Sequence, residues 1–464
     1  MTGLIIDNFA GGGGASTGIE QALGRPVDVA INHDPVAVAM HKENHPDTHH
    51  YCQSVTRADP LDVTQGRPVH LAWFSPDCTH HSKAKGGKPR RQHLRDLAWV
   101  VVLWADRVKP DVIMLENVEE FRHWGPLCAD GYPVKEKRGE TFDRWVKQIR
   151  RAGYKVEWRE LRACDYGAPT IRKRFFLVAR RDGKPITWPK PTHGPAGSGL
   201  LPYRTAAEII DWSLPCPSIF DRPRPLAEKT LQRIARGLKR FVIDAGEPFI
   251  IPVGYGERKG QLPRVNSIKD PLGTVVASGA KHHLVTAYLT KHFGGMTGVD
   301  IRTPFPTATS RATQNTIVTS HLIKYRGTCQ HGQPVADPVP TITAGGTHIG
   351  EVRAFLMKYY GSGENVCEAR EPIHTIPTKE RFGLVTVRGE LYQITDIGMR
   401  MLTPAELFRA QGFPPETNFI PLINGKPINK TQQVRLCGNS VPPPLARALV
   451  AANIPDAAMM EAAE

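Results

Sequence analysis

A cysteine, two histidines and several lysines follow a short apolar run in the stretch WFSPDCTHHSKAKGG, residues 73–87. Cys78 can be a nucleophile if it becomes a thiolate, a metal ligand, or an ordinary buried thiol. Zinc is the least favoured, because Cys78, His80 and His81 are too close in sequence to fill a tetrahedral site and the chain has no Cys-x-x-Cys pair. The stretch alone does not decide between a nucleophile and an inert thiol.

A carboxyl group and two guanidinium groups stand in comparable places further along the chain. Glu116 and Asn117 end the apolar run DVIMLENV (111–118), and Arg172 and Arg174 lead into the apolar run RFFLVAR (174–180). A thiol and a carboxyl at the ends of adjacent strands can converge on one small ring. We therefore expect Cys78 and Glu116 to share a site.

A glycine-rich stretch, DNFAGGGGASTGIE (7–20), separates the first apolar run from a helical pattern. Such a turn lets a nucleotide-like cofactor approach the backbone. A dinucleotide or adenosyl ligand should then meet an acidic residue about 20 positions on. Asn32 stands there instead, with Asp34 two residues later. On its own, this turn does not specify its ligand.

Alternating strand and helix patterns over the first ~180 residues predict how these groups are positioned. Strands are expected at 3–9, 27–32, 69–75, 111–117, 154–161 and 174–180, and helices at 16–23, 35–44 and 92–108. This alternation predicts an α/β fold with a doubly wound, mostly parallel sheet, whose ligands bind outside the carboxyl ends of the strands. The last two strands fit a closing pair.

A turn-rich stretch at 188–202 marks a domain boundary, and an internal repeat follows over 250–390. Prolines 271, 304, 338 and 372 recur at steps of 33, 34 and 34 residues, which indicates stacked units of short β-strands. Each unit carries a lysine: Lys291, Lys324 and Lys358. These lysines either form a regular line of phosphate contacts or belong to a repeat that serves structure alone. The basic helix expected at 226–241 is either a DNA contact or a solvated surface.

The composition of the 464 residues is that of a globular protein with a polyanionic partner. Sixty basic residues against 45 acidic residues give a net charge of +15, which favours nucleic acid over a charge kept for solubility alone. No signal peptide is visible, and the longest apolar run, 97–105, is too short to cross a bilayer. Eight scattered cysteines indicate reduced thiols. We expect a cytoplasmic protein that binds neither membrane nor metal.

Taken together, these motifs resemble those of the DNA cytosine-5 methyltransferases. That family shares DxFAGxGG, a Pro-Cys segment, ENV, YGxPxxRxR, LTPxExxRxQGFP and GNSVPP, in this order. The corresponding stretches here are 7–14, 76–78, 116–118, DYGAPTIRKRFFLV (165–178), RMLTPAELFRAQGFP (400–414) and CGNSVPPPLARAL (437–449). Six motifs in the family's order make the resemblance specific.

The resemblance implies a class I, Rossmann-like domain with a mixed seven-stranded sheet at residues 1–190, completed by 428–464. Residues 191–427 would form a β-rich target-recognition domain. The expected activity is methyl transfer from S-adenosyl-L-methionine, with S-adenosyl-L-homocysteine as product, to a cytosine flipped out of a specific double-stranded DNA sequence. The expected protein is a monomer that serves restriction-linked or phage-encoded modification.

The resemblance also implies roles for single residues. Cys78, as a thiolate of lowered pKa, would add to carbon 6 of cytosine, while Glu116 binds the N3 and amino edge. Arg174 would contact the carbonyl oxygen of the base, with Arg172 supporting it. The loop at 79–93 would close over the base and contact phosphates through Lys83, Lys85, Lys88, Arg90 and Arg91. A basic loop without function is the alternative.

Cofactor residues follow from the same motifs: Phe9 would stack on the adenine, and Asn439 and Ser440 would bring the C-terminal segment to the cofactor. The full expected set is Asp7, Phe9, Ala10, Gly11, Gly12, Gly13, Asn32, His33, Asp34, Ser54, Pro76, Asn117, Asn439 and Ser440.

Three departures from the family pattern stand out: Asp77 separates Pro76 from Cys78, Asn32 replaces a ribose-binding glutamate, and Thr170 replaces a glutamine. The second leaves open a relative that uses a carboxylated cofactor to transfer a larger group. An RNA cytosine-5 methyltransferase is a further alternative, although some 200 residues with repeats favour reading of DNA. A non-catalytic DNA-binding relic and a nucleotide-dependent oxidoreductase fit fewer of the motifs.

Overall fold

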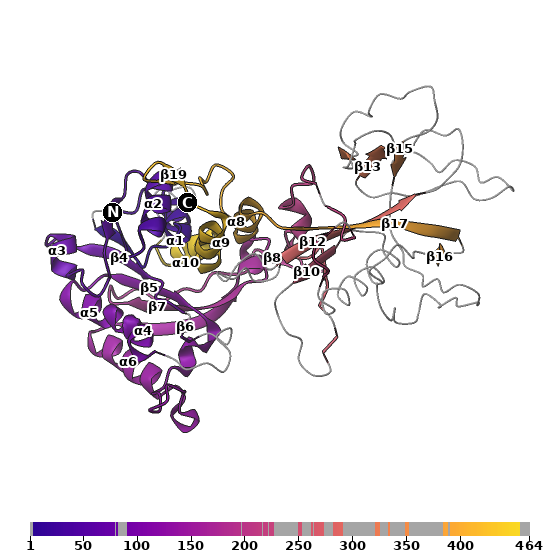
Figure 1. Ribbon diagram of the computed structural model, residues 1–464. Coiled ribbons are helices and arrows are strands. Elements are labelled where there is room, and N and C mark those ends of the chain that lie inside the picture. The colour runs from indigo at the N-terminus through magenta and orange to yellow at the C-terminus, as the bar shows by residue number, and fades with distance from the viewer. Residues whose placement is uncertain are drawn as a thin grey trace. The chain divides into compact units, whose positions relative to one another are not determined.

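The computed structural model describes residues 3–78, 80–81, 91–195, 197–215, 217–220, 222–226, 249–252, 261–262, 264–272, 282–290, 321–324, 333–334, 349–351, 384–387 and 390–454. The chain divides into two compact units (Figure 1). The first comprises 1–208, 271–280 and 404–464, and the second comprises 209–270 and 281–403. The expected domain boundaries at 190 and 428 stay a prediction.

A seven-stranded mixed sheet forms the centre of the first unit, in the order β3-β2-β1-β4-β5-β7-β6. Its strands are β1 (Leu4–Asn8), β2 (Val29–Asn32), β3 (His49–Cys52), β4 (Val69–Phe74), β5 (Val112–Asn117), β6 (Lys155–Arg162) and β7 (Lys173–Arg180). Neighbouring strands are parallel except at β7, which is antiparallel to both β5 and β6. This confirms the predicted α/β class, the mostly parallel sheet and the closing pair.

Successive side chains of each strand point to opposite faces, so the sheet has a core on each side. One core contains Ile6 and Phe74 with the side chains of α5 and α6, including Trp104 and Trp145. The other contains Ile5 with α1 and α10. The helices of this unit are α1 (Gly14–Leu23), α2 (Pro35–Asn44), α3 (Pro60–Thr64), α4 (Gln92–Arg95), α5 (Val100–Arg107), α6 (Glu140–Arg151), α8 (Pro404–Gln411), α9 (Lys430–Asn439) and α10 (Pro443–Asn453).

The helix expected at 92–108 is interrupted. Four residues of 3-10 helix, η2 (Asp96–Trp99), separate α4 from α5. Arg95, the last residue of α4, is buried, and its Nη1 donates a hydrogen bond of 2.7 Å to the carbonyl oxygen of Gly125. The remaining short elements of the unit are η3 (Glu119–His123), η4 (Lys135–Lys137), η5 (Ala163–Tyr166), η6 (Ala206–Glu208), β8 (His193–Gly194), β9 (Leu201–Pro202), β18 (Leu422–Ile423) and β19 (Lys426–Pro427).

The described part of the second unit consists mainly of antiparallel strands. One sheet has the order β11-β10-β12-β17-β16 and another the order β14-β13-β15. Their bounds are β10 (Phe249–Pro252), β11 (Asn266–Ser267), β12 (His282–Thr290), β13 (His321–Lys324), β14 (Gln333–Pro334), β15 (Ile349–Glu351), β16 (Leu384–Val387) and β17 (Glu390–Met401). The basic helix expected at 226–241 lies outside the described residues, as do Lys291 and Lys358, and Lys324 is the last residue of β13. A role in target recognition stays a prediction.

Candidate active site

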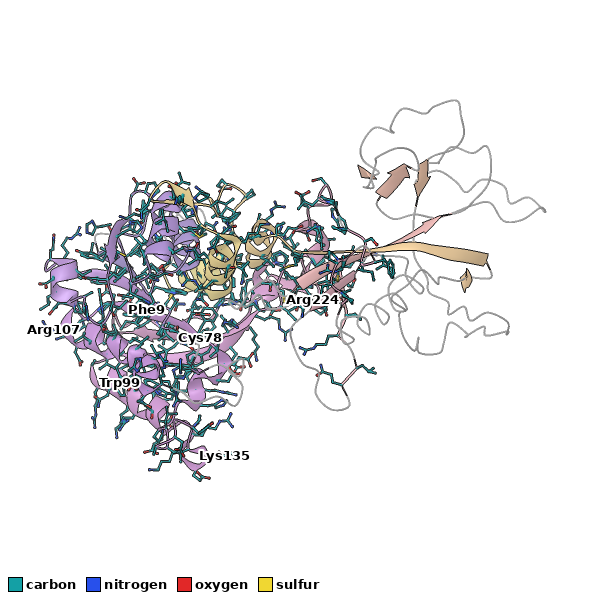
Figure 2. The ribbon with its side chains drawn as sticks, viewed as in Figure 1. Phe9, Cys78, Trp99, Arg107, Lys135 and Arg224 are labelled. Carbon is teal, nitrogen blue, oxygen red and sulfur yellow. The ribbon has the colours of Figure 1, made fainter. Side chains whose placement is uncertain are left out.

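The carboxyl ends of three neighbouring strands are level with one another. Asn8 of β1 pairs with Phe74 of β4, and Phe74 pairs with Leu115 of β5. Antiparallel β7 begins at this same edge, since Asn117 pairs with Phe175. The segments that follow β1 and β4 therefore start side by side, and Figure 2 labels Phe9 and Cys78 on them. The sheet thus brings the predicted thiol, carboxyl and guanidinium groups to one edge.

Asn117 fixes the segment that carries the thiol. Its Nδ2 donates to the carbonyl oxygen of Pro76 at 3.0 Å, and its Oδ1 accepts the backbone N–H of Val118 at 2.9 Å. The side chain is buried at the end of β5. Asn117 therefore holds the strand end carrying Glu116 against the loop carrying Cys78.

The two histidines after Cys78 serve structural contacts. His80 Nδ1 accepts the backbone N–H of Arg91 at 2.8 Å, and the ring of His81 lies edge-on to Phe121 and Trp124, with centroids 5.0 and 5.6 Å away. In the part of the chain that the structure describes, no cluster of His, Cys, Asp or Glu side chains is arranged to hold a metal. Of the predicted phosphate contacts in this loop, Lys83, Lys85, Lys88 and Arg90 lie outside the described residues.

Glu116 and Arg174 form a buried ion pair beside Cys78. Arg174 Nε lies 3.2 Å from Glu116 Oε1, and the two side chains are 13% and 9% exposed. Burial raises the pKa of Glu116, while Arg174 and Arg172 oppose that rise. A carboxyl held in this balance can take up a proton when a neutral, hydrogen-bonding ring replaces water.

The pKa of Cys78 differs from the sequence expectation of a lowered value. Burial raises it to about 11; Arg174 lowers it and Glu116 raises it further. The expected lowering came from the nucleophilic role that the resemblance implies, and it took no account of the burial of the sulfur or of the adjacent carboxylate. The expectation is therefore wrong for the protein without bound substrate, in which Cys78 is a protonated thiol at neutral pH.

Arg172 connects this edge to the C-terminal segment. The side chain is 2% exposed, and Nη1 donates to the carbonyl oxygen of Gly438 at 3.0 Å. Burial and the neighbouring Arg174 lower its pKa to about 9, against the opposing effect of Glu116. Thr170, at a departure from the family pattern, is fully buried and pairs with Leu272.

The glycine-rich turn leaves β1 through an unusual backbone. Phe9 has a φ of 62° and Gly13 a φ of 91°, both in the left-handed region. Asn32, at the end of β2, donates its Nδ2 to the carbonyl oxygen of Ala10 at 2.8 Å. A side chain added at Gly11 would meet no atom of the described residues within 4 Å. The hydrogen bond from Asn32 therefore fixes the turn to β2, while no described residue covers the side-chain position of Gly11.

The other residues expected around the cofactor on β2 and β3 have varied surroundings. Asn32 Oδ1 accepts the backbone N–H of Asp34, and Asp34 makes a 2.6 Å ion pair with Arg435 of α9. His33 is exposed, and Ser54 hydrogen-bonds the hydroxyl of Thr56 at 2.8 Å. The amide of Asn32 thus serves the backbone of the turn.

The C-terminal segment lies against the same turn. A Cβ added at Gly14 would come within 2.1 Å of the carbonyl oxygen of Val441, and one added at Gly12 within 3.3 Å of Ser440 Oγ. Ser440 is buried, whereas Asn439 is exposed at the end of α9. The structure therefore brings Ser440 to the turn, as expected, although residues 209–403 intervene in the chain.

Asp7 is the buried acid at the base of this turn. Ser16 Oγ donates to its Oδ2 at 2.8 Å, and its Oδ1 has no hydrogen-bond partner within the described residues. Burial raises its pKa to about 7, with Ser16 and His45 opposing the rise. A buried carboxylate oxygen without a donor fits a ligand that carries a positive charge or a hydroxyl group.

Sequence reasoning missed two histidines beneath the turn, His41 and His45. They stand four apart on α2, so both lie on one helix face, and this spacing was the available signal. His41 Nε2 lies 2.9 Å from Ser16 Oγ, and His45 Nδ1 lies 2.8 Å from Glu20 Oε2. Both histidines are buried.

Comparison with known proteins connects this arrangement to one family. The family model for C-5 cytosine-specific DNA methylases matches residues 4–207 and 302–454. The Type II methyltransferase M.AquIA of Picosynechococcus sp. is 31% identical over 233 residues, which cover 45% of this chain and 88% of the relative. M.SacI of Streptomyces achromogenes is 29% identical over 41% of this chain and 50% of its own length. M.AgeI of Thalassovita gelatinovora is 31% identical over 40% and 42%.

The match thus spans most of the first relative and about half of the next two. Among solved structures, the methyltransferase EhMeth of Entamoeba histolytica has 12% identity and a TM-score of 0.45, with 97% of each chain covered. At that score the likeness carries no weight for function. Across the described residues, no helix is long and apolar enough to cross a membrane.

Proposed function

Because the chain belongs to the C-5 cytosine-specific DNA methylase family, we propose that it methylates carbon 5 of a cytosine in a specific sequence of double-stranded DNA. The methyl donor is S-adenosyl-L-methionine. The observation that carries the proposal is the convergence of Cys78, Glu116 and Arg174 at the sheet edge next to the glycine-rich turn.

Cys78 supplies the electrons. Carbon 5 of cytosine is a poor nucleophile, and a thiolate that adds to carbon 6 converts the ring into an enamine, in which carbon 5 can attack an electrophilic methyl group. The thiol of the free protein must therefore lose its proton as the base binds. Removal of the proton from carbon 5 and expulsion of the sulfur then restore the aromatic ring.

Glu116 and Arg174 position the base and compensate the charge of the addition. The raised pKa of Glu116 suits a carboxyl that donates a proton to N3 as negative charge develops on the ring. Arg174, already held by Glu116 and by the carbonyl oxygen of Lys173, fits the carbonyl oxygen of the base. Arg172 supports this arrangement from the C-terminal side.

The glycine-rich turn fits the adenosyl cofactor. The open backbone at Gly11, the unpartnered oxygen of Asp7 and the nearby Ser440 are the features that suit it. When bound, the cofactor supplies an electrophilic methyl group. Phe9 leaves the end of β1 where its ring can stack on an adenine, and Asp7 faces the positive part of the ligand.

The net charge of +15 supports DNA binding. The base must also be flipped out, because stacking covers the ring faces from which carbon 5 and carbon 6 are attacked. The proposed phosphate contacts are those of the basic loop at 79–93 and of the repeats: Lys83, Lys85, Lys88, Arg90, Arg91, Lys291, Lys324 and Lys358. A restriction-linked or phage-encoded role in DNA modification is part of the proposal, and the description of two relatives as Type II methyltransferases supports a role in DNA modification.

A mechanism-based trap tests the proposal. Duplex DNA with 5-fluorocytosine at the target site cannot lose its C5 substituent as a proton, so the wild-type protein with cofactor should form an SDS-resistant complex. Cys78→Ala should form none, and Cys78→Ser, of similar size, is the matched control for an intact fold. A covalent complex with Cys78→Ala would overturn the assignment. Transfer RNA that carries 5-fluorocytosine, used in the same assay, separates the RNA alternative.

A further inference from the structure

A chain of hydrogen bonds joins the base of the glycine-rich turn to the surface. Ser16 Oγ lies 2.8 Å from Asp7 Oδ2, His41 Nε2 lies 2.9 Å from Ser16 Oγ, and His41 Nδ1 lies 2.8 Å from His50 Nε2. Asp7, Ser16 and His41 are buried, whereas His50 is half-buried on β3, the edge strand of the sheet. Ser16 and His41 each have one hydrogen-bond partner on either side, so the chain offers a single path from His50 to Asp7.

The direction of the chain is fixed when Asp7 is ionised. The carboxylate only accepts, so Ser16 must donate its single proton to Asp7 and accept from His41 Nε2–H. Burial lowers the pKa of His41 well below its usual range, so the ring is neutral and its Nδ1 must accept from His50 Nε2–H. Every proton in the chain then points toward Asp7.

Protonation of Asp7 at Oδ2 reverses this direction. A protonated Asp7 donates to Ser16, Ser16 donates to His41 Nε2, and His41 donates from Nδ1 to His50 Nε2. The change begins when His50 takes one proton from solvent at Nδ1 and gives its Nε2 proton to His41 Nδ1. His41 gives its Nε2 proton to Ser16, and Ser16 gives its hydroxyl proton to Asp7. One proton enters, one arrives at Asp7, and both rings remain neutral.

We propose that Ser16, His41 and His50 form a proton relay to Asp7, through which binding of the cofactor's ammonium group is coupled to proton release. The inference rests on the proposed function, since it assigns the adenosyl cofactor to the turn above Asp7. Its separate support is the unpartnered, buried Oδ1 of Asp7 and the position of His41 beside the turn, where a Cβ added at Gly13 would lie 3.8 Å from His41 Cδ2.

The titratable groups facing the relay come from three elements. Glu20 of α1 and His45 of α2 face Asp7, and Lys42 of α2 and His49 of β3 face His50. Burial and Lys42 lower the pKa of His50 to about 4, so neither relay histidine titrates near neutral pH.

Asp7 titrates near neutral pH because its pKa is about 7. Its carboxylate favours a cation, so cofactor affinity should be highest above pH 7 and should fall as the pH is lowered through that value. The ammonium group of the cofactor remains protonated in this range, since α-amino groups have pKa values near 8.

Calorimetric titration with S-adenosyl-L-homocysteine between pH 5.5 and 7.5 tests the linkage. The wild-type Kd should rise below pH 7 by up to about tenfold per pH unit. Asp7→Asn should bind more weakly at pH 7.5 and lose the pH step. Ser16→Ala should move the step to higher pH, because the hydroxyl that favours the carboxylate is gone. His49→Gln, a neighbouring histidine outside the chain, is the matched control and should retain the wild-type step.

The tautomer of His41 provides a readout that an effect on folding alone would not produce. With histidines labelled with nitrogen-15, NMR should show His41 protonated at Nε2 at pH 8 and at Nδ1 at pH 6. Saturating S-adenosyl-L-homocysteine at pH 6 should return it to the Nε2–H form. Ser16→Ala should abolish both changes.

The outcomes separate this inference from the proposed function. A wild-type protein that binds the ligand with no pH step, or with one unchanged in Asp7→Asn, or with a fixed His41 tautomer, would refute the relay and leave methyl transfer untouched. A wild-type protein that binds neither S-adenosyl-L-homocysteine nor S-adenosyl-L-methionine at any pH would refute the proposed function itself.

Discussion

Alkylation of Cys78 in the free protein should be slow and steeply dependent on pH. At pH 8 a thiol with a pKa of about 11 is only ~0.1% thiolate, whereas an ordinary thiol with a pKa near 8.5 is ~25% thiolate. The thiolate of higher pKa is intrinsically more nucleophilic by roughly tenfold, which offsets part of this difference. We therefore expect Cys78 to react about 20-fold more slowly than an exposed cysteine.

Peptide-level mass spectrometry after timed exposure to iodoacetamide measures this rate. Cys52 and Cys128, which are exposed, serve as references within the same molecule. From pH 8 to 10 the rate at Cys78 should rise about tenfold per pH unit without a plateau. Glu116→Gln should accelerate the reaction by removing a negative charge, and Arg174→Gln should slow it.

A rate at Cys78 that levels off below pH 8 would refute the reasoning, because it would show a thiolate already formed in the free protein. Changes of the same sign in the Glu116 and Arg174 variants would refute the electrostatic account specifically. If the expected profile is found, the nucleophile is kept protonated until a base arrives, which protects it from adventitious alkylation and oxidation.

Two further pairs of substitutions test how the turn and the start of α2 are built. Gly14→Ala should destabilise the protein by about 1–3 kcal/mol, because the new methyl group would lie 2.1 Å from the carbonyl oxygen of Val441, while Gly11→Ala, facing open space, should leave stability unchanged and weaken cofactor binding. Urea denaturation compares the stability of the two glycine variants, and equal unfolding midpoints would contradict the close contact between Gly14 and Val441. Asp34→Asn removes the partly exposed pair with Arg435 but can still cap α2, so it should cost less than about 1 kcal/mol. Asp34→Ala should cost about 1 kcal/mol more, which the same measurement checks.

The sheet and its functional edge were predictable because strand and helix patterns alternate clearly in the sequence. The apolar runs that end at Asn8, Phe74 and Asn117 placed the chemistry-bearing residues at strand ends, and the register makes those ends level. The sequence could not show that the sulfur of Cys78 is buried next to a carboxylate, which sets the direction of its pKa shift. That depends on packing between segments distant in the chain.

The relay was missed for a related reason. His41 and His50 belong to different elements, and only the packing of α2 against β3 and α1 brings them to Ser16. A histidine on a mostly apolar helix is more often a satisfied core residue than a functional one, so the spacing of His41 and His45 was a weak signal and nothing in the pattern connected His50 to them. The interruption of the helix at 92–108 likewise coincides with a tertiary contact that a local pattern does not show, the hydrogen bond between Arg95 and Gly125.

The packing of Val441 and Ser440 against the glycine-rich turn has a consequence for the synthesis of the enzyme. A ribosome makes β1 and the turn early, yet the segment that packs on them leaves the ribosome only after the long intervening unit has been made. A nascent chain therefore lacks this neighbour of the turn throughout most of its synthesis. If the turn binds the methyl donor as proposed, ribosome-bound or prematurely terminated products would be unable to modify DNA.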